Sequence, residues 1–146
     1  MAYLLKVQNK SMILGLVIGA VLGFLNWEGA DIYAVNNRDE AWAVRQAMKN
    51  INADLPKMID DETRIDSVSI SMELKTYDMI FTVVNYESAE IDKGILRSGF
   101  KEITIPAFCA DKVVKIWFDM DYTVNTIYHD KVGEAIEKYS MTSSDC

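Results

Sequence analysis

An uninterrupted apolar run near the N-terminus constrains this chain more than any other feature. Residues 12–25 carry no charge, Lys6 and Lys10 precede them, and all 22 acidic residues follow them. The uncharged stretch of residues 11–27 would form about 25 Å of helix. A hydrocarbon core is about 30 Å thick, and about 17 residues is the lower limit for crossing it. The sequence therefore predicts a transmembrane helix over residues 12–27.

The charges on either side of this run predict its orientation. Lysines precede it and acids follow it, which favours a cytoplasmic N-terminus, residues 1–11, and a larger part on the outer side. Lys10 can snorkel at one interface, and Trp27 suits the other. Residues 28–36 would then be a connector, and residues 37–146 an outer domain.

A cleaved signal peptide is the alternative interpretation of the same residues. A basic start followed by an apolar stretch is typical of both classes. Cleavage requires small residues shortly after the stretch, but Glu28-Gly29-Ala30 contains a charge there. The sequence Ile32-Tyr33-Ala34 suits cleavage better but lies further from the run. A retained anchor is therefore favoured, with the cleaved leader as the alternative.

Three glycines in the apolar run share one side of the predicted helix. Gly15, Gly19 and Gly23 are four residues apart, so they fall near one face. Small residues in such a row let two membrane helices approach closely, which predicts a homo- or hetero-oligomer formed through this segment. The alternative is that glycine is simply common in membrane helices.

Composition limits the outer part to one acidic globular domain. Half of the chain is apolar, which is enough for a core and argues against disorder. After the apolar run the charge is −9, because only Lys6 and Lys10 precede it and the whole chain carries −7. This balance argues against a nucleic-acid partner. An acidic surface suits a basic partner, or it serves solubility alone.

The two cysteines, Cys109 and Cys146, predict a disulfide bond in an oxidising compartment. The bond would hold the end of the chain against the middle of the domain. A metal pair and a catalytic thiol are the alternatives, but a metal site needs more ligands than two distant cysteines and His129 provide. We therefore expect neither a metal nor a cofactor.

Hydrophobic periodicity predicts an α+β domain. Apolar residues at helical spacing alternate with stretches rich in β-branched residues. The expected order α-β-β-α-β-β implies an antiparallel sheet with helices packed on one face. Residues 113–117 fit either a helix or a strand. The expected elements cover residues 41–51, 64–72, 77–83, 88–104, 122–128 and 135–141.

A longer pattern carries a resemblance to known proteins. Residues 52–68 read NADLPKMIDDETRIDSV, and the later chain adds Asn85-Tyr86, Cys109, a D-x-x-G turn and a C-terminal Asp-Cys. Over about residues 40–146 this resembles a loose group of small, exported or membrane-anchored bacterial proteins of uncharacterised function. The resemblance supports a bacterial envelope location and the disulfide. Together with the predicted anchor, this predicts a single-pass protein of the bacterial inner membrane with a periplasmic domain. It implies no activity.

A second local pattern points to a different chemistry. Residues 116–124 read IWFDMDYTV, which resembles the first motif of haloacid-dehalogenase-type phosphatases. That resemblance would make Asp119 the phosphoryl-accepting nucleophile and Asp121 an acid/base, both beside Mg²⁺. The family also needs parallel strands downstream, and each crossover takes about a dozen residues or more. The short remaining tail favours two aspartates in a loop that precedes a strand.

Aromatic residues and a single histidine complete the candidate sites. Trp117, Tyr122, Tyr128 and Tyr139 form a candidate binding surface, because these residue types are enriched at interfaces. They suit a half-buried sheet equally well. His129 is the only histidine, either a pH-sensitive group or an ordinary surface residue.

The sequence thus predicts a non-catalytic, membrane-anchored interaction module that binds another envelope protein. An inhibitor, immunity-type or exclusion protein acting on a toxin, hydrolase or phage factor is the first alternative. A Mg²⁺-dependent phosphatase that uses Asp119 and Asp121 is the second and less favoured alternative.

Overall fold

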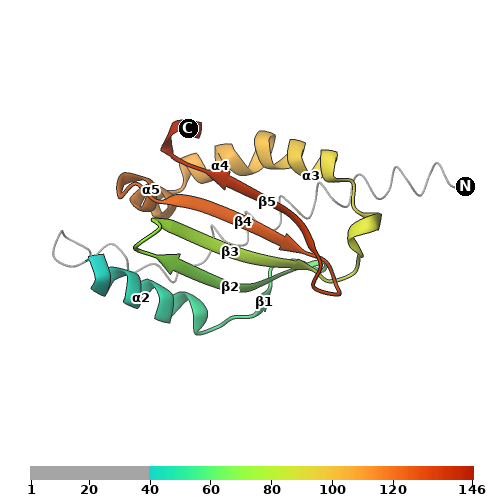
Figure 1. Cartoon of the computed structure of the whole chain (residues 1–146), viewed down its shortest axis with the longest axis horizontal. Coiled ribbons are helices and arrows are strands. Elements are labelled where there is room, and N and C mark those ends of the chain that lie inside the picture. Colours follow the sequence, from blue (N-terminus) through green and yellow to red (C-terminus); the bar gives the residue numbers. More distant parts are fainter. Residues whose placement is uncertain (1–39) are drawn as a thin grey trace, which may run out of the picture.

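The structure of the chain, a computed structural model, describes residues 40–146 (Figure 1). The predicted membrane helix, its glycine row of Gly15, Gly19 and Gly23, and the connector lie outside these residues. Within residues 40–146, no helix combines the length and apolar composition that crossing a bilayer requires.

The described residues form one sheet and a set of helices. The helices are α2 (Glu40–Asn52), η2 (Ser88–Glu90), α3 (Lys93–Gly99), the π-helix η3 (Phe100–Thr104), α4 (Ile105–Ala110), α5 (Lys112–Asp119) and η4 (Ser143–Asp145). The strands are β1 (Lys57–Met58), β2 (Thr63–Ser71), β3 (Thr76–Val83), β4 (Thr123–His129) and β5 (Ala135–Met141). The α+β class and both hairpins, β2–β3 and β4–β5, are as predicted.

The sheet is mixed, so the prediction of a purely antiparallel sheet was wrong. Its strands lie in the order β1-β2-β3-β4-β5, and β3 pairs with β4 in parallel while the other pairs are antiparallel. A parallel pair needs a long connection between its strands, usually a helical one. Residues 84–122 supply it as a helical crossover that returns the chain to the starting end of β3 (Figure 1).

One face of the sheet carries the core. Tyr77, Met79, Phe81 and Val83 alternate along β3 and are all buried. Their neighbours on β4 are in register with them and are buried as well, for example Tyr128 beside Phe81. This period of two is the pattern expected for a strand with one face packed on a core.

The helices complete this core. Their buried apolar side chains join one cluster with the inward residues of the strands. The cluster members from the helices are Val44, Ile51, Leu96, Phe100, Phe108, Val114, Trp117 and Phe118. The expected packing of helices against one face is therefore consistent with the single core.

The crossover continues further than the sequence predicted. Pro106 was expected to end the second helix near Thr104, yet α4 runs on to Ala110. The wider π turn of η3 accounts for this: the N–H of Ile105 bonds the carbonyl of Phe100, five residues back. Pro106 then lies in the first turn of α4, where a missing N–H costs little.

Asn52, the last residue of α2, takes the place of a strand at the edge of β2. Its side-chain amide donates to the carbonyl of Val68 at 2.9 Å and accepts from the Val68 N–H at 3.1 Å. The two-residue β1 covers the same edge only at Arg64 and Ile65. The side chain therefore satisfies backbone groups that the short strand does not reach.

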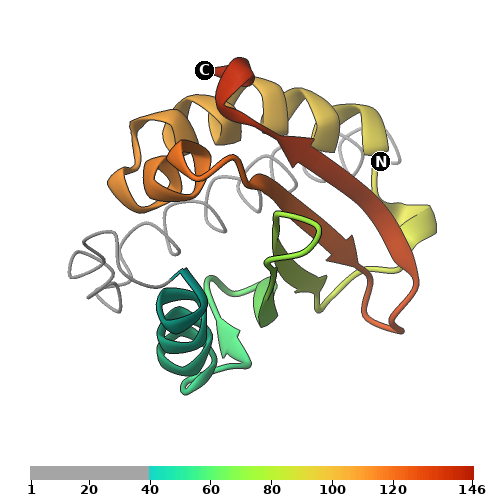
Figure 2. The same ribbon diagram turned by 60° about the vertical axis from the view of Figure 1, so that its left-hand side comes forward.

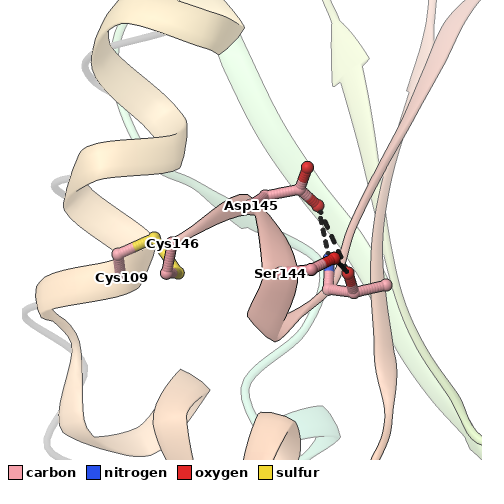
Figure 3. The surroundings of a disulfide bond; sticks show 5 residues. Cys109, Ser144, Asp145 and Cys146 are labelled. Carbon is pink, nitrogen blue, oxygen red and sulfur yellow. Dashed lines mark hydrogen bonds between the residues drawn. A yellow bond between two sulfur atoms is a disulfide. The ribbon is translucent and has the colours of Figure 1, made fainter.

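A disulfide joins Cys109 at the end of α4 to Cys146 in the structure, with 5.5 Å between the Cα atoms (Figure 3). The turn before Cys146 is closed by hydrogen bonds: Asp145 accepts from the N–H of Thr142 at 2.8 Å, and the Thr142 and Ser144 hydroxyls lie 2.7 Å apart. The segment after β5 is thereby held against the helical layer.

Removing the Asn52 side chain should weaken the fold. Asn52→Ala leaves two backbone groups of Val68 without these partners, which costs about 1–3 kcal/mol of unfolding free energy. Asn50→Ala, at an exposed position of the same helix, is the matched control and should be neutral or slightly stabilising. Urea unfolding measures both changes, and equal effects would contradict the role assigned to Asn52.

Opening the disulfide should also lower stability. The two cysteines are 37 residues apart, and closing a loop of that length contributes about 4 kcal/mol in the chain-entropy account. Cys109→Ser should therefore unfold at lower urea concentration than the oxidised protein, and a reductant should have no further effect on it. The reduced wild-type protein should match the variant. A wild-type midpoint that does not respond to reductant would contradict the prediction.

Candidate functional site

The two ends of the sheet differ in chemistry. At one end lie three connecting segments, called loops below: residues 56–62, which include the two-residue β1, residues 84–92 and residues 130–134 (Figure 1). We call this the acidic end. The β2–β3 hairpin, residues 72–75, lies at the opposite end with α5 and the start of α2. We call that the hairpin end.

Most of the net negative charge of residues 40–146 is concentrated at the acidic end. Its three loops carry Lys57 and Lys131 as their only basic residues. Their acidic residues are Asp60, Asp61, Glu62, Glu87, Glu90, Asp92, Asp130 and Glu134. Such a concentration of one sign creates a local field that attracts basic groups and repels acidic ones.

Hydrogen bonds and an ion pair fasten the three loops to one another. The Val84 N–H donates to the carbonyl of Glu62 at 2.9 Å, and the Lys131 N–H donates to the carbonyl of Tyr86 at 3.0 Å. Lys131 also pairs with Glu87 at 3.4 Å. The acidic end is therefore a connected surface, and its carboxylates are held on a fixed backbone.

Asp130 is the centre of this arrangement. It is buried, and one carboxylate oxygen accepts from the N–H groups of Val132 and Glu134 while the other accepts from the Ser88 N–H at 2.9 Å. Burial acts to raise the pKa of Asp130, but backbone hydrogen bonds from Glu134, Ser88, Val132 and Gly133 outweigh it and lower the pKa. The ionised carboxylate thus ties the β4–β5 turn to the loop after β3.

Exposed apolar side chains lie among the acids. Met58 and Val132 are both exposed at this end. Tyr86 belongs to the loop of residues 84–92, where burial and the carboxylates of Glu62 and Glu90 raise its pKa. Apolar groups beside charges are typical of surfaces that bind proteins.

The four aromatic residues predicted as a candidate binding surface are core residues. Trp117, Tyr122, Tyr128 and Tyr139 are each between 1% and 7% exposed. They pack on one another: Tyr122 meets Trp117 edge-on at 5.1 Å, and Tyr128 meets Tyr139 at 6.1 Å. Every second side chain of β4 and β5 points into the core, and Tyr128 and Tyr139 are at such positions. Trp117 lies on the buried face of α5.

Burial also removes these phenols from acid–base chemistry near neutral pH. It raises the pKa of Tyr128 well above its usual range. For Tyr139, burial and the nearby Glu137 carboxylate raise the pKa to about 12 despite the opposing charge of Arg97. Both side chains therefore remain neutral and serve packing.

Asp119 and Asp121 do not have the setting that the phosphatase motif requires. Residues 116–118 belong to α5, and the helix ends at Asp119, so no apolar strand precedes the first aspartate. The exposed Asp119 carboxylate pairs with Lys115 one helical turn earlier, at 2.9 Å. Asp121 has a positive φ of 62° in the turn that leads into β4. Asp119 therefore pairs within the helix, and Asp121 belongs to the turn that follows it.

His129 lies at the end of β4 and next to Tyr128, whose side chain is in the core. Alternation places the histidine on the opposite face of the sheet. Among residues 40–146, no group of three or more His, Cys, Asp or Glu side chains could hold a metal ion.

Sequence reasoning missed the acidic end because its three loops are far apart along the chain. The turn signal at Asp130-Lys131-Val132-Gly133 was visible, but its hydrogen bond to Ser88 spans 42 residues. The acidic end becomes visible when the strand order is known and the charges of each loop are counted. The signal was the excess of acids at strand ends rather than any short motif.

The ionised state of Asp130 should make stability pH-dependent. Its folded-state pKa lies below the unfolded value of about 3.9, so the carboxylate stabilises the fold above that pH. This contribution is lost as the pH falls through the folded-state pKa. Asp130→Asn should therefore destabilise the protein at neutral pH and differ progressively less from wild type in acid. Asp54→Asn, in an exposed turn, is the control, and urea midpoints from neutral to acid pH are the measurement.

No known protein family and no curated protein matches this sequence. Solved structures do share its fold. A candidate secreted protein of Pseudomonas aeruginosa, PA3611, superposes with a TM-score of 0.60 at 7% identity, over 70% of this chain and 88% of that chain.

Two pilotins of Vibrio species are also similar. The type 2 secretion system pilotin EpsS of Vibrio vulnificus superposes with a TM-score of 0.52 at 16% identity, over 70% of this chain and 90% of that chain. The type II secretion system pilotin AspS of Vibrio cholerae gives 0.47 at 16% identity, over 68% of this chain and 84% of that chain. The chain thus shares its fold with a candidate secreted protein and with a secretion-system pilotin.

Proposed function

We propose that residues 40–146 form a non-catalytic binding domain of the bacterial envelope, held at the inner membrane by the predicted helix of residues 12–27. The domain would lie in the periplasm and bind another envelope protein. The acidic end is the surface that carries this proposal, because it joins a fixed backbone, a concentration of carboxylates and exposed apolar side chains.

Three further observations support an envelope location. The Cys109–Cys146 bond fits an oxidising compartment such as the periplasm. The fold is also that of EpsS, which is a component of a secretion system, and of a candidate secreted protein. The resemblance of residues 52–68 to exported bacterial proteins points to the same compartment.

The chemistry of the acidic end identifies the class of partner. Eight carboxylates against two lysines favour a basic surface on the partner, and Met58 and Val132 would add apolar contact. Exposed carboxylates at the rim act mainly on the rate of association, so binding should weaken as salt is added.

An inhibitor or immunity-type protein is the second candidate. The same acidic end favours it, because a basic toxin, hydrolase or phage factor would dock on that surface. The two candidates differ in the source of the partner: a resident envelope protein in one case, and an incoming protein in the other.

The phosphatase alternative has little geometric support. Its motif lies on a helix end, and Asp119 is paired with Lys115 on the surface. A direct test remains simple: hydrolysis of a small aryl phosphate with Mg²⁺ by the purified full chain, lost in Asp119→Asn, would revive this alternative.

Charge reversal at the acidic end tests the proposed function. Asp61→Lys with Glu134→Lys changes two exposed carboxylates and should greatly weaken capture of the partner from native membranes by the full-length protein. The matched control is Asp54→Lys with Glu102→Lys, an equal charge change at exposed positions that belong to neither end. The measurement is the amount of each co-purified protein at low and moderate salt.

The proposal expects one envelope protein to be lost from the first variant and kept by the control. Equal loss in both variants would mean that overall charge, and not the acidic end, drives capture. If none of the samples contains a specifically co-purified protein, the proposal of a resident envelope partner is overturned. That result would favour an incoming protein as the partner.

A further inference from the structure

Exposed apolar side chains gather at the hairpin end. The described residues contain five exposed large hydrophobic side chains, and three of them, Trp42, Met72 and Leu74, belong to α2 and the β2–β3 hairpin. Leu74 is the most exposed of the five at 72%. A folded domain rarely places several such groups together without using them.

The topology brings these three residues to one end of the sheet. Asn52 bonds Val68, and β1 then pairs with the start of β2, so the chain leaves α2 away from the hairpin. The start of α2 therefore points toward the hairpin. Trp42 is ten residues before Asn52, which corresponds to about 15 Å of helix. This length is similar to the length of strand and turn from Val68 to Leu74. In Figure 1 the first turn of α2 and this hairpin lie toward the same end of the sheet, and Figure 2 shows them apart from each other.

The two ends also differ in charge. At the hairpin end, residues 72–75 and 111–122 carry Lys75, Lys112 and Lys115 against Glu73, Asp111, Asp119 and Asp121, so acids and bases nearly balance. At the acidic end, carboxylates outnumber lysines eight to two. Bacterial bilayers rich in anionic lipid repel a negative surface and tolerate a nearly neutral one.

The chain reaches α2 at the hairpin end as well. If residues 12–27 span the membrane, residues 28–39 can extend at most about 40 Å. Glu40 must then lie within that distance of the bilayer, on the same end as Leu74. Measured along the sheet from this attachment point, the acidic end lies beyond the hairpin end by the length of β3, about 25 Å.

We infer that the hairpin end rests on the lipid bilayer that holds the anchor, with Leu74, Met72 and Trp42 in the headgroup region. This inference rests on the proposed membrane anchoring and adds an orientation to it. Leu74 lies between Glu73 and Lys75, so the contact is shallow, because neither charge enters the hydrocarbon. Tryptophan and leucine are suited to the interface.

The acidic end would then face away from the membrane, toward the periplasm. A basic partner would meet it without competing with the lipid surface. The orientation thus assigns a different partner to each end of the sheet: lipid to the hairpin end, and protein to the acidic end.

Position-specific fluorescence tests this orientation. Leu74 and Val132 are matched in exposure: each lies in a turn between two strands, 72% and 69% exposed, and the two turns are at opposite ends of the sheet. Leu74→Cys and Val132→Cys in the full-length, disulfide-bonded protein each accept one environment-sensitive dye. The proteins are reconstituted in phosphatidylethanolamine–phosphatidylglycerol vesicles that contain lipid spin-labelled at the headgroup.

The expected result is several-fold stronger quenching of the dye at position 74 than at position 132. Quenching should be weaker when the spin label is deep in the acyl chains, since the contact is shallow. Leu74→Glu in an unlabelled chain should increase amide hydrogen exchange of residues 72–75 in vesicles but not in detergent. That second measurement does not depend on the dye.

Two results would overturn the inference, and they are distinguishable. If the protein floats with the vesicles but both positions are quenched equally, the anchor stands and the orientation fails. If the protein does not float with the vesicles, the membrane anchoring fails and the orientation fails with it. Protection of the hairpin that requires a protein partner would also assign this end to that partner instead.

Discussion

The parallel pairing of β3 with β4 determines most of this structure. Two neighbouring strands that run in the same direction force the chain between them to return along the sheet, and here the return is helical. That crossover supplies Phe100, Phe108 and Trp117 to the core and carries Cys109. It also separates the two hairpins, so that each end of the sheet receives loops from distant parts of the chain. The acidic end is a product of this topology.

Local patterns in the sequence predicted most elements and little of their arrangement. Alternation along residues 77–83 and 135–141 identified β3 and β5, and helical spacing identified α2. Periodicity could not show that β3 and β4 are parallel, because both arrangements bury every second residue. The π turn at Phe100 and the two-residue β1 also left no periodic signal, since each depends on contacts elsewhere in the fold.

Sites were predicted less well than elements, for a related reason. Trp117 and Tyr128 attracted attention as residue types, yet burial decides whether an aromatic side chain binds a partner or fills a core. The residue types around Asp119 match a catalytic motif, but their structural context does not. The motif requires a strand before the first aspartate, and the structure has the helix α5 there. The disulfide was predictable, because the sequence contains one pair of cysteines. The structure joins these two residues, Cys109 and Cys146.

The Asn52 amide has a consequence for self-association. Uncovered strand edges invite a second chain to add itself, and natural sheets commonly block them with charges, bulges or covering segments. At Val68 a single side chain occupies both backbone groups, so an incoming strand finds neither a donor nor an acceptor there. This one residue therefore blocks strand addition at Val68 on the β2 side of the sheet, whose other edge strand is β5.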